Sequence, residues 1–400
     1  MPGRKTTGTA PKRQRPYPSP GVAAVGCTTD HLRMRLGHVP VLDAVRGIAI
    51  LLVLIVHVGY PGHLLPGGVL GVDLFFVLSG FLITSLLLTE WNDRGAISLR
   101  AFYRRRALRL LPALVVMLAI VSAVLVATGE LDQLVWVGYS LGYVVNVAAL
   151  DGGISATSLK HMWSLSQEEQ FYLVWPIALL VLLRARTRPQ TLAVVLVAIA
   201  MVILAWRTFL GLAMASPGYL LYAPETRSIG LVLGCLAGVL FSYGLVARVP
   251  LWLATPMLVP AGMAVAALGL GSRWDAVVLV PTFCVAATIV LLACVLHPRW
   301  WFARLIDRAW LRGLGKISYA LYLWHWPLYY AFGWVIGLPL AIVVACLSYR
   351  FVELPFLRRR YPKTDQATTT PRGKATIPPA VAPGLKTSAR PAGMSSSASS

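Results

Sequence analysis

The sequence predicts an all-α protein in which about ten helices cross a membrane. The chain has 400 residues, of which 57% are hydrophobic and 13% are charged, whereas soluble domains carry about 25% charged residues. Its mean hydropathy is +0.70. The net charge of +21 is concentrated in the two tails and in short segments between apolar runs. This distribution favours basic loops held in the cytoplasm over a nucleic-acid-binding surface.

Ten apolar runs have nearly the length of ~20 residues that a helix needs to cross hydrocarbon. They cover residues 41–60, 69–89, 107–127, 168–185, 191–211, 227–247, 250–270, 276–296, 317–336 and 338–356. An eleventh run, 133–150, is interrupted by glycine and polar residues. The Arg-rich segments between the runs stay on one side with the basic N-terminus only if 133–150 does not cross. We therefore expect 133–150 to be re-entrant or interfacial, and both termini to be cytoplasmic in a multi-pass plasma-membrane protein.

Both ends of the chain lack hydrophobic periodicity. Residues 1–38 are predicted to form a disordered basic arm and 361–400 a disordered cytoplasmic tail, which leaves 39–360 as the membrane domain. The first apolar run is not typical of a secretory signal, because it begins late and contains ionisable residues. The five cysteines include no CxxC pair, so neither a disulfide framework nor a metal site is expected.

The first apolar run, Val41–Tyr60, contains three ionisable residues, and such residues in a spanning helix suggest a functional site. Arg46 and His57 are eleven residues apart, so they lie nearly on one helix face about 16 Å apart along the axis. Asp43 is one turn before Arg46 and is placed to pair with it. The run therefore predicts a polar stripe, with Arg46 near the cytoplasmic end and His57 towards the outer surface.

The second run opens with GVDLFFVLSGFLIT, residues 71–84. Asp73 lies at the depth of His57, so a helix cap and a place in the site are both open interpretations. Ser79 and Gly80 are more typical of close helix packing.

The third run is entered through FYRRRALRLLP, residues 102–112. Its arginines at one-turn spacing, Arg105, Arg106 and Arg109, can bind phosphate through their guanidinium groups. An interfacial anchor is enough to explain Arg104. Arg109 lies inside the apolar run, where an anchor would be costly, so a ligand is favoured there.

The segment HMWSLSQEEQFYLVWP, residues 161–176, enters the fourth run from the outer side. It brings Trp163, Ser164, Glu168 and Tyr172 to the mouth of an apolar helix. Ser166 and Glu169 fit a capping box, which leaves Glu168 unexplained.

Three later motifs carry further candidates. YAPETRSIG, residues 222–230, places Glu225 and Arg227 as a surface pair or as part of the site. GKISYALYLWHWP, residues 315–327, takes Tyr322 and His325 into the membrane, with Trp324 and Trp326 as a cavity lining. In SYRFVELP, residues 348–355, Arg350 and Glu353 are expected to form a structural ion pair.

In this order, the Arg–ten residues–His helix, GVDLFFVLSGF, RRRxxRxxP, WSLSxExQFYLxWP, GKISYxLYLWHWP and SYxxxExP resemble the acyltransferase-3 family of integral membrane O-acyltransferases. The likeness covers roughly residues 40–357. Gln167 departs from the apolar residue common in the WSLS motif, and no esterase-like domain is expected after the last helix.

The resemblance implies transfer of an acyl group, often acetyl, from cytoplasmic acyl-CoA to a hydroxyl, usually on a carbohydrate at or beyond the outer face. Some relatives acylate macrolide-type secondary metabolites. By motif position it implies His57 as the catalytic base with Arg46 as its partner, Arg106 and Arg109 near the CoA phosphates, and Glu168 as the acidic residue. The full set of expected site residues is His57, Arg46, Glu168 and Asp73 for catalysis, Arg105, Arg106 and Arg109 for acyl-CoA, and Trp163, Ser164, Tyr172, Arg227, Tyr322 and His325 for substrate.

The expected mechanism is general-base catalysis. A neutral His57 takes the proton of the acceptor hydroxyl, with Asp73 or Glu168 orienting the imidazole or the sugar. Transient acylation of the histidine stays open, and no metal is required. A transporter or flippase of a polar lipid or sugar would use the same buried charges as a path, whereas a scaffold without chemistry would leave His57 and Arg109 unexplained.

Overall fold

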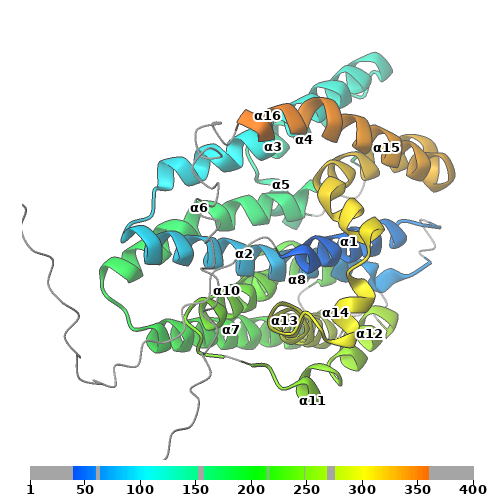
Figure 1. Ribbon diagram of the computed structural model, residues 1–400. Coiled ribbons are helices and arrows are strands. Elements are labelled where there is room, and N and C mark those ends of the chain that lie inside the picture. Colours follow the sequence, from blue (N-terminus) through cyan, green and yellow to red (C-terminus); the bar gives the residue numbers. More distant parts are fainter. Residues whose placement is uncertain are drawn as a thin grey trace, which may run out of the picture.

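The computed structural model describes residues 39–59, 64–151, 157–213, 216–246, 248–267 and 275–359. These residues form helices and connecting turns, with no strand among them. The arm 1–38 and the tail 361–400 predicted to be disordered lie outside them. Figure 1 shows α1 and α2 in the middle of the molecule, with α3, α6 and α15 on one side and α7, α10 and α13 on the other.

The helices have the following bounds: α1 Pro40–Ile55, η1 Pro66–Val69, α2 Leu70–Arg94, α3 Leu99–Thr128, η2 Leu131–Gln133, α4 Leu134–Leu141, α5 Val145–Ala148, η3 Ala149–Asp151, α6 Met162–Arg184, α7 Pro189–Leu212, α8 Pro217–Tyr222, α9 Pro224–Arg227, α10 Ile229–Ser242, α11 Leu251–Ala254, α12 Leu258–Ala267, η5 Asp275–Leu279, α13 Val280–Leu296, α14 Trp301–Ile306, α15 Ala309–Leu347, η6 Ser348–Glu353 and α16 Leu354–Arg359.

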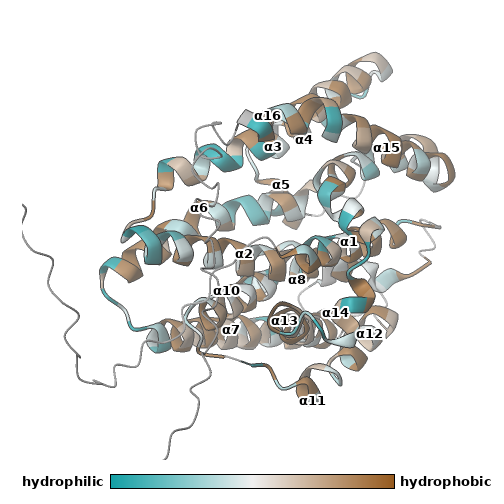
Figure 2. Cartoon of the chain, viewed as in Figure 1, coloured by the Kyte–Doolittle hydropathy of each residue, from teal (hydrophilic) through white to brown (hydrophobic). Residues whose placement is uncertain are grey.

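Five helical stretches in the described part of the chain are long and apolar enough to cross a membrane. They are Pro66–Arg94, Leu99–Thr128, Pro189–Leu212, Ala276–Leu296 and Ala309–Arg358. Figure 2 shows hydrophobic residues along these helices, with hydrophilic ones gathered where α2 ends and α3 begins. The all-α multi-pass membrane protein is therefore confirmed, and the number of ten crossings stays a prediction.

The last of these stretches is broken at Gly333. Its φ of 66° and ψ of 172° are not helical, and only glycine adopts a positive φ of this kind without strain. After the break the chain turns back, so that Gly337 lies against the backbone of Leu328. Two helical arms therefore occupy the region in which the sequence predicted two runs.

The segment 133–150 contains no helix long enough to cross a bilayer. The eight residues of α4, Leu134–Leu141, extend only about 12 Å at the helical rise. Tyr143 has a φ of 52° and separates α4 from α5. The Gln170 side chain on α6 then donates to the carbonyl oxygen of Tyr143 at 2.8 Å and to Asn146 at 2.9 Å. The segment is thus held against α6 as short pieces.

Glycines bring the central helices into backbone contact. A side chain at Gly80 of α2 would collide with the backbone of Leu231, and one at Gly234 of α10 with that of Val77. The close packing predicted at Gly80 is confirmed, whereas Ser79 does not serve packing alone, because its hydroxyl donates to Glu168. Gly315 of α15 meets the backbone of Asp43 in the same way, so α1 is fixed against the helix that carries Tyr322 and His325.

Candidate active site

A cavity of about 450 Å³ lies between α1, α2, α3, α6 and α15. One end, between the end of α2 and the start of α3, is charged and is lined by Glu90, Asp93, Arg94 and Arg105. Arg106, Arg109, Arg46, Ser79, Glu168 and Tyr172 line the middle, and the other end reaches Ser164, Ser318 and Tyr322. The volume is in the range of about 300–1,000 Å³ typical of small-molecule sites.

The predicted phosphate-binding arginines all reach this cavity but differ in their partners. Arg105 lies 3.6 Å from Glu90. Arg106 is 2.6 Å from Glu169, and its guanidinium carbon is 3.0 Å from the ring centroid of Tyr172. Arg109 forms no hydrogen bond or ion pair with any described residue. It is therefore the arginine of the three whose donors are open to a ligand.

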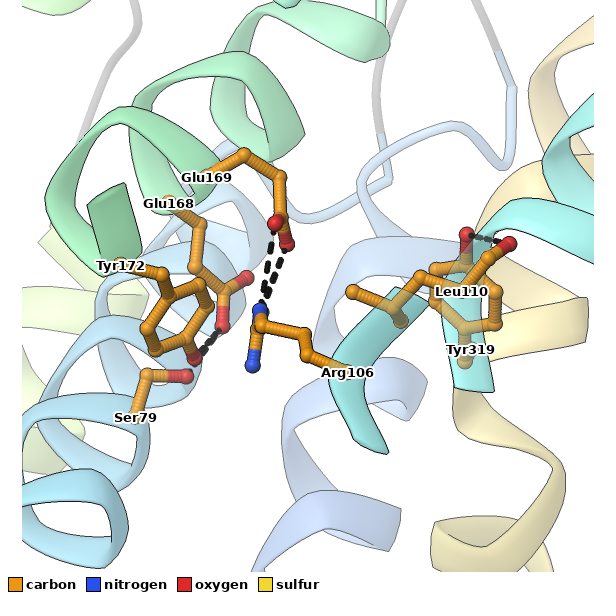
Figure 3. Close-up of polar contacts among 7 residues, drawn as sticks. All are labelled: Ser79, Arg106, Leu110, Glu168, Glu169, Tyr172 and Tyr319. Carbon is orange, nitrogen blue, oxygen red and sulfur yellow. Dashed lines mark hydrogen bonds and ion pairs between the residues drawn. The ribbon is translucent and has the colours of Figure 1, made fainter. Parts of the chain in front are cut away.

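Glu168 and Glu169 are adjacent in sequence and form hydrogen bonds with different partners (Figure 3). Glu169 accepts hydrogen bonds from Arg106. Glu168 accepts from the hydroxyls of Ser79 and Tyr172. The capping box predicted for Ser166 and Glu169 is wrong, because α6 already begins at Met162 and its first turn precedes both residues.

Arg46 faces the cavity and is paired one turn away with Asp43 at 3.3 Å. This confirms the pairing expected from their spacing. α1 ends at Ile55, and His57 lies in the turn that follows, its amide donating to the carbonyl oxygen of Leu54 at 3.1 Å. His57 does not line the cavity; it lies beyond the end marked by Tyr322.

Hydroxyl groups line the inner end of the cavity, opposite its charged end. Tyr322 donates to the carbonyl oxygen of His161 at 2.8 Å and is hydrogen-bonded to Ser164. Trp163 packs edge-on against Phe76, with ring centroids 6.4 Å apart. Ser164 and Tyr322, which were both assigned to the site from the sequence, are thus in direct contact.

Behind Tyr322 lies a group of rings, which we call the imidazole cluster: the half-buried His57 with the buried His161, His325, Trp326 and Tyr329. The His57 ring centroid is 4.7 Å from that of Trp326 and 5.2 Å from that of His325, and His325 is 5.2 Å from His161. Trp326 is a ring of this cluster, so it is buried rather than interfacial. The cavity lining predicted for Trp324 and Trp326 is wrong, because neither residue lines the cavity described above.

The hydrogen bond of His57 fixes its tautomer. Its Nδ1 lies 2.7 Å from the carbonyl oxygen of Val53. A carbonyl oxygen can only accept, so Nδ1 carries the proton and the neutral ring has its lone pair on Nε2. This is the form of histidine that a general base requires.

Asp73 and Arg227 form a buried ion pair at 2.5 Å, and both are fully buried. The Sγ of Cys284 lies 3.9 Å from the other carboxylate oxygen of Asp73. The surface pair of Glu225 and Arg227 is wrong: Glu225 instead accepts from Tyr219 at 2.7 Å, and this hydrogen bond raises the pKa of Tyr219. Asp73 and Arg227 therefore pair with each other. In the described part of the chain, neither of them contacts the imidazole cluster.

Arg207 was missed by sequence reasoning. It is fully buried on α7 and donates to the carbonyl oxygens of Ala276, Leu220 and Thr226 at 2.8 to 2.9 Å. Its presence inside the apolar run 191–211 was the available signal. Arg207 therefore joins α8, α9 and η5 close to the buried pair of Asp73 and Arg227.

The ion pair predicted for Arg350 and Glu353 is wrong. Glu353 is 3% exposed, and its Oε1 has no hydrogen-bond partner. The two residues lie in the π-helix η6. The wider turn of a π-helix moves residues three apart off a shared face.

No group of three or more His, Cys, Asp or Glu side chains is arranged to hold a metal ion in the part of the chain that is described.

Comparison with known proteins identifies relatives over most of the chain. SACOL0978 of Staphylococcus aureus (strain COL) is 31% identical over 366 residues, which cover 82% of this chain and 58% of that protein. The peptidoglycan O-acetyltransferase OatA of Listeria monocytogenes is 28% identical over 81% of this chain and 56% of that protein. The O-acetyltransferase OatA of S. aureus (strain NCTC 8325) is 29% identical over 81% and 58%, respectively.

This chain thus spans somewhat more than half the length of the curated relatives it matches. No solved structure matches it. A family model described as an acyltransferase domain matches residues 39–350. Because this match covers well over half of the chain, the chain belongs to the acyltransferase-3 family.

Proposed function

We propose that this protein transfers an acyl group, acetyl in the first instance, from cytoplasmic acyl-CoA to a hydroxyl of a carbohydrate or glycosylated acceptor at the outer face. The observation that carries the proposal is an arginine-lined cavity whose far end adjoins the imidazole cluster. The relatives named O-acetyltransferases, one of them for peptidoglycan, support a carbohydrate acceptor.

The cavity residues fit an acyl-CoA donor. Guanidinium groups are well suited to phosphates, and Arg105, Arg106 and Arg109 lie towards the charged end. The apolar walls of α2 and the hydroxyls of Ser164 and Tyr322 suit the narrow arm that bears the thioester. In this assignment Arg46 and Glu168 position the donor between the two ends, and Trp163 and Tyr172 shape the passage.

The chemistry assigned to His57 is general-base catalysis. Its Nε2 lone pair takes the proton of the acceptor hydroxyl as the oxygen attacks the thioester carbonyl, a role worth about 10²–10⁴ in rate. Asp73 and Arg227 remain candidates for the site, although their mutual ion pair favours a structural role.

The proposal also sets an orientation. The arginine-rich end of the cavity faces the cytoplasm together with both termini, in agreement with the distribution of basic residues. His57 then lies towards the outer surface, where an envelope glycan or a secreted macrolide-type metabolite would be the acceptor.

A flippase of a polar lipid or sugar is the competing function, because buried charges also line translocation paths. Radiolabelled acetyl-CoA distinguishes the two. In membranes that contain the protein, an acyltransferase leaves label covalently bound to an envelope glycan or metabolite, and a flippase leaves none.

The donor assignment gives a prediction for Arg109. Arg109→Gln removes a charge-assisted contact worth about 1.5–3 kcal/mol, so KM for acetyl-CoA is expected to rise by about 10- to 100-fold. Because the contact is remote from the reacting atoms, kcat should change little. Arg104→Gln is the matched control: Arg104 is exposed outside the cavity and its loss should leave KM unchanged. Equal KM values for the two variants would contradict the assignment.

A further inference from the structure

A buried imidazole lies between the half-buried His57 and the cavity. His325 on α15 is fully buried, and its ring centroid is 5.2 Å from that of His57 and 5.3 Å from that of Tyr322. Tyr322 lines the inner end of the cavity, whereas neither histidine does. His325 therefore connects the proposed general base with the wall of the donor cavity.

His325 has the same tautomer as His57. Its Nδ1 lies 2.6 Å from the carbonyl oxygen of Tyr322, so Nδ1 carries the proton and Nε2 has the lone pair. This buried Nε2 has no hydrogen-bond partner. Most buried polar atoms are paired, and an unpaired one calls for an explanation such as a catalytic role.

No carboxylate among the described residues is placed to stabilise a protonated His325. Neither His325 nor the adjacent His161 forms an ion pair with an Asp or Glu among the described residues. A protonated imidazole there has no carboxylate to stabilise it, in contrast to the histidine of a Ser-His-Asp triad. A proton that reaches His325 is therefore readily passed on.

We propose that His325 carries the proton from His57 to the thiolate that leaves the acyl donor, an inference that rests on the proposed acyl transfer. The acceptor O–H bond breaks and its proton moves to Nε2 of His57, while the oxygen forms a bond to the thioester carbonyl carbon. The carbon–sulfur bond then breaks. His325 takes the proton from His57 and delivers it to the sulfur, so the products are an ester and a thiol and both rings are neutral again.

The two histidines have different roles because they lie on different sides of the imidazole cluster. The acceptor approaches His57, and the sulfur leaves on the cavity side, which His325 approaches through Tyr322. His161 also contacts Tyr322 and His325, at 5.6 and 5.2 Å between ring centroids. It has no ring contact with His57, so it lies off the path.

The test compares two donors, acetyl-CoA and acetyl-seleno-CoA, with the full chain in membranes. A selenol is a much stronger acid than a thiol, so its anion leaves without needing a proton. His325→Gln should lower transfer from acetyl-CoA by about 10² or more and transfer from the selenium donor by less than about tenfold. His57→Gln should lose transfer from both donors. His161→Gln, the matched change in the same cluster, should respond to the two donors as the wild type does.

Equal losses from both donors in His325→Gln, or no loss from either, would overturn the relay. If that variant does not accumulate, the wild type is measured in heavy water: the relay requires a larger solvent isotope effect with acetyl-CoA than with the selenium donor, and equal effects overturn it. A wild type that transfers acetyl from neither donor would overturn the proposed function itself, which separates the two failures.

Discussion

Replacing His57 with alanine should reduce acyl transfer to the background, a loss of at least about 10²–10⁴, while the protein still inserts and accumulates. The reason is the hydrogen bond from Nδ1 to Val53 at 2.7 Å, which leaves the Nε2 lone pair as the base of the imidazole cluster. Transfer is measured as radiolabel moved from acetyl-CoA to glycan, and accumulation as membrane-bound protein.

A second histidine provides the control for this substitution. His297 bonds through Nε2 to the carbonyl oxygen of Val249 at 2.9 Å and has no ring contact with the cluster. His297→Ala should therefore keep its transfer activity. Normal product formation by His57→Ala, or an equal loss in both variants, would defeat the assignment of His57 as the base.

Breaking the buried pair of Asp73 and Arg227 should have the largest effect on stability. Arg227→Met leaves the fully buried Asp73 carboxylate without its partner, and loss of one member of a buried pair costs about 3–5 kcal/mol of the free energy of unfolding. The midpoint of heat-induced aggregation of the detergent-purified protein measures the loss.

The double substitution Asp73→Leu with Arg227→Met separates stability from catalysis. Replacing both members by apolar residues is often close to neutral, so the heat-aggregation midpoint should largely recover. If the pair is structural, acyl transfer recovers with it. A double variant as stable as the wild type but inactive would instead show that Asp73 or Arg227 acts in the reaction.

Local spacing accounts for the parts of the site that the sequence predicted correctly. Asp43 and Arg46 are one helical turn apart and pair as expected. Gly80 permits the close approach of α10 because it lacks a side chain. Arg109 stands in an apolar run and lines the cavity, and its binding of a ligand stays a prediction. Each of these inferences needed only neighbours along one helix.

Contacts between distant segments could not be predicted from spacing. Arg227 finds Asp73 across more than 150 positions of the chain, where its near neighbour Glu225 seemed the simpler partner. Arg207 is held by backbone carbonyls, which every residue has and which leave no pattern in a sequence. His161 joins His325 only because α6 and α15 converge.

Irregular backbone was the other source of error. The spacing of Arg350 and Glu353 predicts a pair in an α-helix, but the chain forms a π-helix there. α6 begins a turn earlier than the capping pattern indicated. In both places the observed helix boundary differs from the one that the local pattern assumed.

A donor that enters from the arginine-lined end should acylate a hydroxyl on the opposite side of the membrane. Inverted membrane vesicles that contain the protein are loaded with glycan fragments from the cell envelope, and radiolabelled acetyl-CoA is added outside. Label should appear on the enclosed glycan, and only with an intact His57. Label on glycan added outside with none inside, or label inside that survives His57→Ala, would contradict the account.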